Sequence, residues 1–352
     1  MARSFGAWKS PITTQLITQG SLRLGAVRAE SGYVVWNESR PLEGGRGVLV
    51  RAKVGLDGTC GAPSDLTPVG YNVRTLVHEY GGGEYLVAPD AVFFSNMEDQ
   101  RLYRQSLGDG TEPGEPQPLT PAGVPLRFAD YVLDAPRNRL IAIVEDHTDD
   151  RPSAVKNFIG AVSLRGAAAD GSFPPIETVV EGADFFASPR LSPDGLSLAY
   201  VSWNHPMMPW DETTLSVAAL SGDSAGEVRV VAGGPDGEGQ AVMAPLWSPA
   251  DGRLYFTTDT TGWWSVWREE SAGGVCSPLC ASEGSEYGGP AWGLGAQPYA
   301  FLPDGQLLCT WVPYPGPQYS HTCTGCPLPS PSSRAVEIPS PAWQHTSVGG
   351  AD

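Results

Sequence analysis

Ser224 is the residue whose neighbours best match a catalytic pattern. Gly222, Ser224 and Gly226 satisfy the G-x-S-x-G spacing of a nucleophile elbow. That motif is reactive where a strand enters a sharp turn and a helix follows, because the turn then lifts the serine over an oxyanion hole. Here both flanking segments, 214–220 and 227–231, are strand-like. The motif is therefore predicted to be a hairpin loop, and Ser224 is not expected to be a nucleophile.

The sequence also offers no partners for such a serine. An α/β-hydrolase needs an acid and then a histidine downstream of its nucleophile. The histidines that follow Ser224 are His321 and His345, and both lie in a segment rich in Pro and Ser. We therefore assign no catalytic residue, and the sequence leaves open whether this chain belongs to an enzyme.

One short segment has the spacing of half a zinc site. It contains His321, Cys323 and Cys326. A closed structural zinc site needs four ligands, and no second pair of Cys or His lies at a suitable distance along the chain. The other cysteines are scattered: Cys60, Cys276, Cys280 and Cys309. In a chain without a secretory signal they are expected to stay reduced, so neither a metal nor another cofactor is predicted.

Two loops concentrate residues that could contact a ligand. The loop 203–211 combines Trp, His, Met and Asp side chains after a strand, and loops on a rigid scaffold often carry binding residues. The loop 78–83 joins His, Glu and Tyr to three glycines, which allow close backbone approach. The candidate contact residues are Trp203, Asn204, His205, Trp210, Asp211, His78, Glu79 and Tyr80. The alternative for both loops is plain packing, with the tryptophans buried against sheet edges and the glycines fitting a narrow space.

The strands that are expected to carry these loops belong to a pattern that repeats along the chain. A turn followed by a short run of strand-forming residues returns roughly every 50 residues, with no helical period between the copies. The turns are 31–32, 89–90, 135–138, 192–195, 248–252 and 302–305. A repeat of this length and composition is typical of a β-propeller.

Polar segments between the copies keep the same phase. They are 65–68, 118–121, 179–182, 230–233 and 279–282. Each repeat is therefore predicted to be a four-stranded blade, whose first two strands are joined by a tight turn of the kind that Asp and Gly favour. The fold is predicted to be an all-β propeller with about six recognisable blades.

Composition limits the class of partner. The chain has 43 glycines and 33 prolines among 352 residues, as expected of many short strands and turns. Its formal net charge of −17 and the lack of a basic cluster argue against nucleic-acid binding, and favour solubility or cationic ligands. No run of 18 apolar residues is present, so no membrane span is expected. A cytoplasmic location is expected, with an organellar one as the alternative because the first 29 residues contain no acid.

These segments together resemble the propellers of the S9 prolyl-oligopeptidase family, specifically its acylaminoacyl-peptidase-like and dipeptidyl-peptidase-like members. The resemblance runs from about residue 7 to about residue 311. The matching segments are 8–13, 72–83, 94–96, 99–104, 145–147, 181–195, 203–211, 261–264 and 299–305.

The resemblance implies a two-domain serine peptidase, in which a propeller of about seven blades caps an α/β-hydrolase and admits only small peptides. The family's catalytic residues belong to the hydrolase domain, and no position here matches them. The chain is thus expected to be a substrate-gating propeller whose partner is a short peptide or a hydrolase domain. Two alternatives are a non-catalytic protein-interaction propeller and a propeller-type sugar or lactone hydrolase.

The chain is expected to divide into three parts. Residues 1–20 form an N-terminal extension, and residues 21–311 form the propeller, which could be incomplete. Residues 312–352 form a tail rich in Pro and Ser, which cannot build a core and is expected to be disordered.

Overall fold

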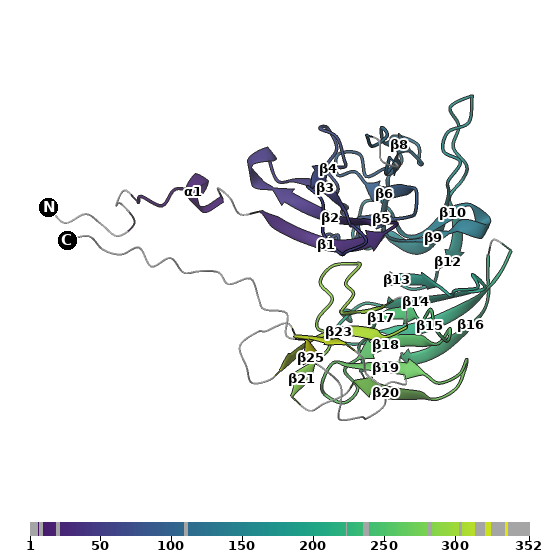
Figure 1. The fold of residues 1–352 in the computed structure, drawn as a ribbon. Coiled ribbons are helices and arrows are strands. Elements are labelled where there is room, and N and C mark those ends of the chain that lie inside the picture. The colour runs from purple at the N-terminus through teal and green to yellow at the C-terminus, as the bar shows by residue number, and fades with distance from the viewer. Residues whose placement is uncertain are drawn as a thin grey trace, which may run out of the picture. The chain divides into compact units, whose positions relative to one another are not determined.

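The structure is a computed structural model in which β-strands predominate (Figure 1). It describes residues 6, 10–18, 22–108, 112–222, 224–234, 239–280, 284–302, 305–313, 321–324 and 335–336. Within these ranges the helices are one short α-helix, α1 (Thr14–Thr18), and two 3₁₀ helices, Pro41–Glu43 and Ala135–Arg137. The prediction of an all-β chain is confirmed.

The chain forms two compact units. The first comprises Met1–Glu181 with Gly293–Gly295, and the second comprises Gly182–Trp292 with Ala296–Asp352. In the first unit the described residues form three antiparallel sheets of four consecutive strands each. The first sheet is β1 (Arg23–Glu30), β2 (Tyr33–Arg40), β3 (Arg46–Lys53) and β4 (Ser64–Asp65). The second is β5 (Tyr85–Val87), β6 (Ala91–Ser95), β7 (Leu102–Ser106) and β8 (Gln117–Pro118). The third is β9 (Leu126–Asp134), β10 (Arg139–Asp146), β11 (Lys156–Ser163) and β12 (Glu177–Val180).

Two further sheets of this kind lie in the second unit. One is β13 (Phe185–Leu191), β14 (Ser197–Trp203), β15 (Thr214–Ser221) and β16 (Ser224–Gly233). The other is β17 (Val242–Trp247), β18 (Leu254–Thr258), β19 (Ser265–Glu269) and β20 (Cys276–Cys280). The propeller-type arrangement is thus present in five regular four-stranded blades of the described chain.

The sixth sheet departs from the predicted pattern. It contains β21 (Ser285–Glu286), β22 (Tyr299–Phe301), β23 (Leu307–Pro313), β24 (His321–Thr324) and β25 (Ala335–Val336). Both β21 and β22 pair with β23, at its opposite ends. The segment between them contains Gly288, Gly289, Pro290, Gly293, Gly295 and Pro298, residues that weaken or interrupt a strand. A sixth regular blade is therefore not confirmed.

The predicted phase of the repeat agrees with the strand order. In the five regular blades, each predicted turn lies between the first and second strands, and each polar segment begins in the fourth. Of the turn 302–305, residues 303–304 lie outside the described residues, but the Gly305 N–H donates to the Leu302 carbonyl at 2.9 Å. Of the predicted tail, the structure describes residues 312–313, 321–324 and 335–336, all in strands.

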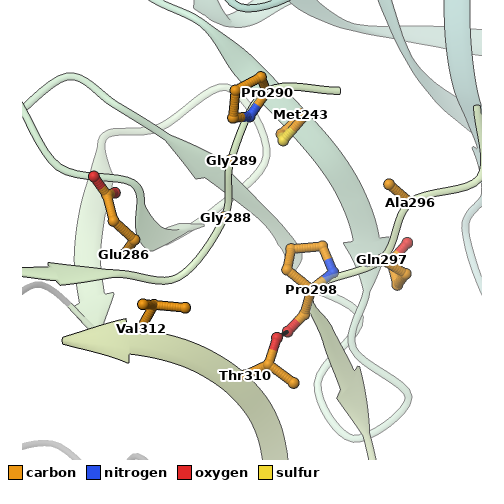
Figure 2. A pocket seen from close by; sticks show the side chains of 10 residues that line it. All are labelled: Met243, Glu286, Gly288, Gly289, Pro290, Ala296, Gln297, Pro298, Thr310 and Val312. Atoms are coloured by element: carbon orange, nitrogen blue, oxygen red, sulfur yellow. Dashed lines mark hydrogen bonds between the residues drawn. The ribbon is translucent and has the colours of Figure 1, made fainter. Parts of the chain in front are cut away.

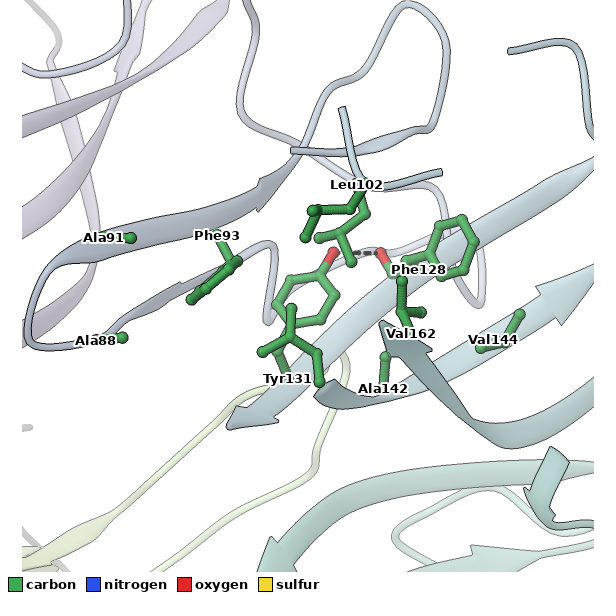
Figure 3. Close-up of a cluster of buried hydrophobic side chains, with 11 residues drawn as sticks. Ala88, Ala91, Phe93, Leu102, Phe128, Tyr131, Ala142, Val144 and Val162 are labelled. Atoms are coloured by element: carbon green, nitrogen blue, oxygen red, sulfur yellow. Dashed lines mark hydrogen bonds between the residues drawn. The ribbon is translucent and has the colours of Figure 1, made fainter. Parts of the chain in front are cut away.

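Buried aromatic and aliphatic side chains hold neighbouring blades of the first unit together (Figure 3). Phe93 on β6, Phe128 on β9 and Leu140 on β10 are fully or nearly fully buried. Burial of such side chains contributes about 1.5–3 kcal/mol each. The Tyr131 hydroxyl donates to the Phe128 carbonyl at 2.9 Å, and burial raises the pKa of this phenol. The core thus satisfies its buried polar group internally.

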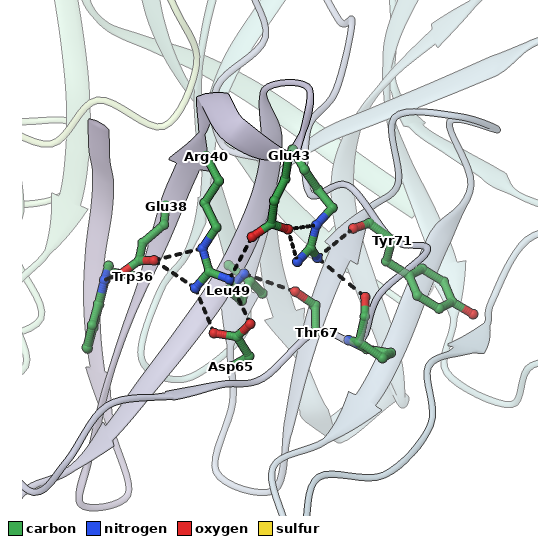
Figure 4. A network of polar contacts seen from close by, with 10 residues as sticks. Trp36, Glu38, Arg40, Glu43, Leu49, Asp65, Thr67 and Tyr71 are labelled. Carbon is green, nitrogen blue, oxygen red and sulfur yellow. Dashed lines mark hydrogen bonds and ion pairs between the residues drawn. The ribbon is translucent and has the colours of Figure 1, made fainter. Parts of the chain in front are cut away.

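A polar network fastens the two-residue strand β4 to its sheet (Figure 4). The Arg40 guanidinium donates to Asp65 on β4 at 2.6 Å and to Glu38 at 2.8 Å. The Leu49 N–H donates to the Thr67 hydroxyl at 3.0 Å, just beyond β4. Side-chain bonds therefore supplement the two residue pairs that join β3 and β4.

Candidate functional site

The two candidate loops occupy equivalent ends of their own sheets. In a four-stranded antiparallel sheet, the loop between the second and third strands leaves from the same end as the connection to the next sheet. The loop 203–211 joins β14 to β15, and the loop 78–83 lies in the connection from β4 to β5. The opposite end of each sheet carries the tight turns that the sequence repeat predicts.

The glycines of the loop 78–83 pack against other backbone segments of the first unit. A Cβ atom would lie 2.5 Å from the Thr75 oxygen at Gly81, and 2.3 Å from the Leu294 oxygen at Gly82. At Gly83 it would lie 2.9 Å from the Asp130 Cα. Gly82 also forms a parallel bridge with Leu294. The sequence left open whether these glycines allow a ligand to approach or fit a narrow space, and the structure shows close packing against backbone atoms.

A buried carboxylate anchors the same loop. Glu145 on β10 is 5% exposed, and its Oε1 accepts a hydrogen bond from the His78 backbone N–H at 3.1 Å. Its Oε2 lies 3.3 Å from Arg127 Nη1 and 2.8 Å from His147 Nε2. Arg127 also reaches Glu79, at 3.1 Å. We call Glu79, Arg127, Glu145 and His147 the Glu145 cluster.

The environment of His78 disfavours its charged form. Burial lowers the pKa of its imidazole, and the nearby Glu145 carboxylate opposes that effect without cancelling it. His78 and Glu79 have φ angles of 53° and 63°, in the left-handed region that few non-glycine residues adopt. The next residue, Tyr80, is 60% exposed. Glu145 thus holds the backbone at His78, and Tyr80 lies exposed two residues further on.

In the loop 203–211, the first three candidate residues are attached to the start of β13. Trp203 is 9% exposed and stacks on Phe185, with ring centroids 5.3 Å apart. The rings of His205 and Phe185 form a T-shaped pair, with centroids 4.9 Å apart. The Asn204 Oδ1 accepts the Asp184 N–H at 2.8 Å, and the His205 N–H donates to Asp184 Oδ2 at 2.9 Å. These contacts fix the base of the loop.

The tip of the loop is more open. Trp210 is half-buried against Trp292, with ring centroids 4.5 Å apart and ring planes tilted by 42°. Trp292 is 57% exposed, and Met207 and Met208 are exposed too. The Asp211 carboxylate accepts the Met208 N–H at 2.9 Å. We call Met207, Met208, Trp210 and Trp292 the tryptophan patch.

The eight candidate residues divide between the two units. His78, Glu79 and Tyr80 belong to the first unit, and the other five belong to the second. The contact-residue prediction omitted Arg127, Glu145 and Trp292. Glu145 carries a detectable signal, because a carboxylate that follows the apolar run 140–144 on a buried strand needs a partner. Trp292 lies in a Gly-rich segment that gives no such signal.

The motif around Ser224 is a hairpin, as predicted. Ser221 at the end of β15 pairs with Ser224 at the start of β16, and Ser224 is exposed. Cys326 of the half zinc motif lies outside the described residues. Among the residues that the structure does describe, no group of three or more His, Cys, Asp or Glu side chains could hold a metal ion. No helix in the described part is long and apolar enough to cross a membrane.

Comparisons with known proteins give matches among solved structures. No protein-family model matches the chain, and no curated protein matches it. A puromycin-hydrolysing peptidase from Mycobacterium tuberculosis is 34% identical, with a TM-score of 0.76 over 96% of this chain and 48% of the peptidase. A puromycin hydrolase is also 34% identical, with a TM-score of 0.77 over 91% of this chain and 47% of that protein. This chain therefore spans about half the length of these two proteins.

A more distant match concerns the fold alone. It is a structure from a study of two prolyl endopeptidases, and it is 14% identical to this chain. The TM-score is 0.58, over 91% of this chain and 43% of the endopeptidase.

Proposed function

We propose, from the premise that this chain belongs to the S9 prolyl-oligopeptidase family as a β-propeller domain, that it selects the substrates of a serine exopeptidase that acts on short peptides. The observation that carries the proposal is the 34% identity over 96% of the chain to a puromycin-hydrolysing peptidase. The function proposed here is restriction of access to a catalytic α/β-hydrolase domain.

Within this proposal the candidate residues have two different roles. Trp203, Asn204 and His205 are engaged with β13, so they hold the loop rather than contact a partner. Trp210 and Asp211 at the loop tip, together with Glu79 and Tyr80, are partly or largely exposed. These four residues are proposed to meet the substrate or the hydrolase domain, because partly exposed aromatic residues on rigidly held loops are frequent contact residues.

A second candidate function has support from the tryptophan patch. Met207 and Met208 on the loop 203–211 are exposed, and so is Trp292, which packs against Trp210 of this loop. Exposed Met and Trp side chains also suit a protein-interaction surface. A non-catalytic interaction propeller would use this surface for a separate protein rather than for a hydrolase domain. The two functions differ in whether the chain changes peptide hydrolysis.

A chimeric enzyme tests the proposed function. The half of the puromycin hydrolase that corresponds to this chain is replaced by residues 1–352, and hydrolysis of short chromogenic peptide amides is measured. The hydrolase half alone is the control. The proposal predicts that the chimera cleaves short peptides and discriminates against long ones more strongly than the control. A folded, active chimera with the same preferences as the hydrolase half alone would favour the interaction function.

A further inference from the structure

A cavity of about 350 Å³ lies within the second unit, beside the segment 286–298 and strand β23 (Figure 2). Its volume falls in the range of small-molecule sites, about 300–1,000 Å³. Much of its wall is apolar, with contributions from Met243, Pro298 and Val312. None of its lining residues belongs to a candidate loop, and it is large enough for a compact ligand.

Glu286 supplies the only charge among the ten residues drawn in Figure 2. Its Oε2 accepts the Trp264 backbone N–H at 2.6 Å, and no described residue donates a hydrogen bond to its Oε1. The segments 240–247, 286–298 and 305–313, which contribute the lining, contain no Lys or Arg. A carboxylate beside apolar walls, with no cation in these segments, is best satisfied by a charged donor.

An aromatic pair stands next to the cavity wall. The wall residue Pro290 is two residues from Trp292, and the Trp292 N–H donates to the Pro290 carbonyl at 3.1 Å. Trp292 packs with Trp210 and remains 57% exposed. Indole faces attract both cations and apolar groups. Neither ring lines the cavity, so the affinity for a positively charged ligand is assigned to Glu286.

We propose that this cavity binds small molecules in which an ammonium group is joined to a compact apolar body. The ammonium group donates to Glu286, and the apolar body contacts Met243 and the proline rings. A free alkylamine and the amino-terminal residue of a peptide share this chemistry. The inference concerns binding by the second unit itself and does not depend on the proposed peptidase function.

Calorimetric titration of the full chain tests the proposal with three probes. L-Phenylalaninamide represents an amino-terminal residue, and benzylamine represents a free alkylamine. N-Acetyl-L-phenylalaninamide has the same apolar body without the charge. We expect saturable binding of at least one amine and at least about tenfold weaker binding of the acetylated probe, because hydrogen bonds to charged groups are among the stronger ones. The amine that binds shows whether the ligand is the amino-terminal residue of a peptide or a free alkylamine.

Two variants locate the binding site. Glu286→Gln keeps an oxygen that can accept the Trp264 N–H but removes the charge, so amine affinity should fall at least about tenfold. Glu227→Gln, at an exposed position on β16, is the matched control and should change nothing. At Gly289 a Cβ would meet no atom within 4 Å, so Gly289→Leu extends a side chain into open space and should abolish binding. Thermal melting checks that each variant is folded.

Three results would overturn the proposal. The first is no saturable binding of either amine by the native chain at up to about 10 mM, a concentration that reveals even weak sites. The second is equal binding of L-phenylalaninamide and its acetylated form by the native chain. This comparison does not depend on the folding of any variant. The third is amine binding that neither Glu286→Gln nor Gly289→Leu weakens.

Discussion

At the scale of single residues, Ser224 shows that a reactive serine depends on the element that follows it. Its G-x-S-x-G spacing is complete, but β16 follows the turn where a nucleophile elbow has a helix. We predict that a fluorophosphonate probe leaves Ser224 unlabelled, as measured by intact-protein mass. Ser224→Ala is the control, and stoichiometric labelling that disappears in this variant would contradict the prediction.

The lowered pKa of His78 leads to a prediction about how stability depends on pH. Burial lowers the pKa of its imidazole below the ordinary value of 6.5, so the unfolded chain binds a proton more readily than the folded one. The stability that the neutral imidazole contributes is complete above about pH 6.5 and is lost as the pH falls through the folded-state pKa. The free energy of unfolding of the native protein should therefore decline below pH 6.5.

The variant His78→Asn isolates this effect from the titration of other groups. Asparagine tolerates the left-handed backbone found at this position. The free energy of unfolding, measured by urea titration at pH 7.5 and pH 5, should decrease less in the variant than in the native protein. Equal decreases in the two proteins would show that His78 titrates alike in the folded and unfolded states.

At the scale of elements, the local signals predicted the regular blades well. The turns 192–195 and 248–252 lie between first and second strands because their residues favour tight turns. In the sixth sheet, two short strands, β21 and β22, pair with opposite ends of β23. This arrangement was not predicted, because the sequence repeat locates turns but does not locate a Gly-rich interruption of a strand. The Glu145 cluster joins residues of distant sequence position, and such long-range partners leave no local pattern.

The backbone crossing at Gly82 gives a prediction with a matched control. Gly82 and Gly70 both have strongly positive φ angles, 94° and 100°. An added Cβ would lie 2.3 Å from the Leu294 oxygen at Gly82 but would meet nothing within 4 Å at Gly70. Both alanine variants lose the conformational freedom of glycine, and only Gly82→Ala adds a clash. Gly82→Ala should be less stable by a further 1–3 kcal/mol or so in chemical denaturation. Equal losses would show that the crossing is not tight.

Two variants of the loop 203–211 distinguish residues that pack within the fold from residues that contact a substrate or a partner domain. Trp203 is buried on Phe185, so Trp203→Ala should cost about 3–5 kcal/mol of stability. Trp210 is only half-buried, so Trp210→Ala should cost less than this. In the chimeric peptidase, Trp210→Ala should alter kcat/KM for short peptides. Equal stability losses for the two variants, with unchanged kinetics for Trp210→Ala, would assign the whole loop to packing.

At the scale of the whole molecule, the strand arrangement and the sequence similarity to known structures indicate the same family. Five regular blades and 34% identity to a puromycin-hydrolysing peptidase place this chain in the S9 family as a propeller domain. The net charge of −17 supports the proposal that a ligand carries a positive charge. Since the chain spans about half of its relatives, the proposed function concerns what the propeller adds to a hydrolase.

The most direct test is the size selectivity of the chimeric peptidase. The ratio of kcat/KM for a tripeptide amide to that for an unstructured peptide of about 30 residues is measured in the chimera and in the hydrolase half alone. We expect residues 1–352 to raise this ratio about tenfold or more, equivalent to about 1.4 kcal/mol of discrimination. A folded, active chimera whose ratio equals that of the hydrolase half alone would contradict the proposal that this propeller selects substrates.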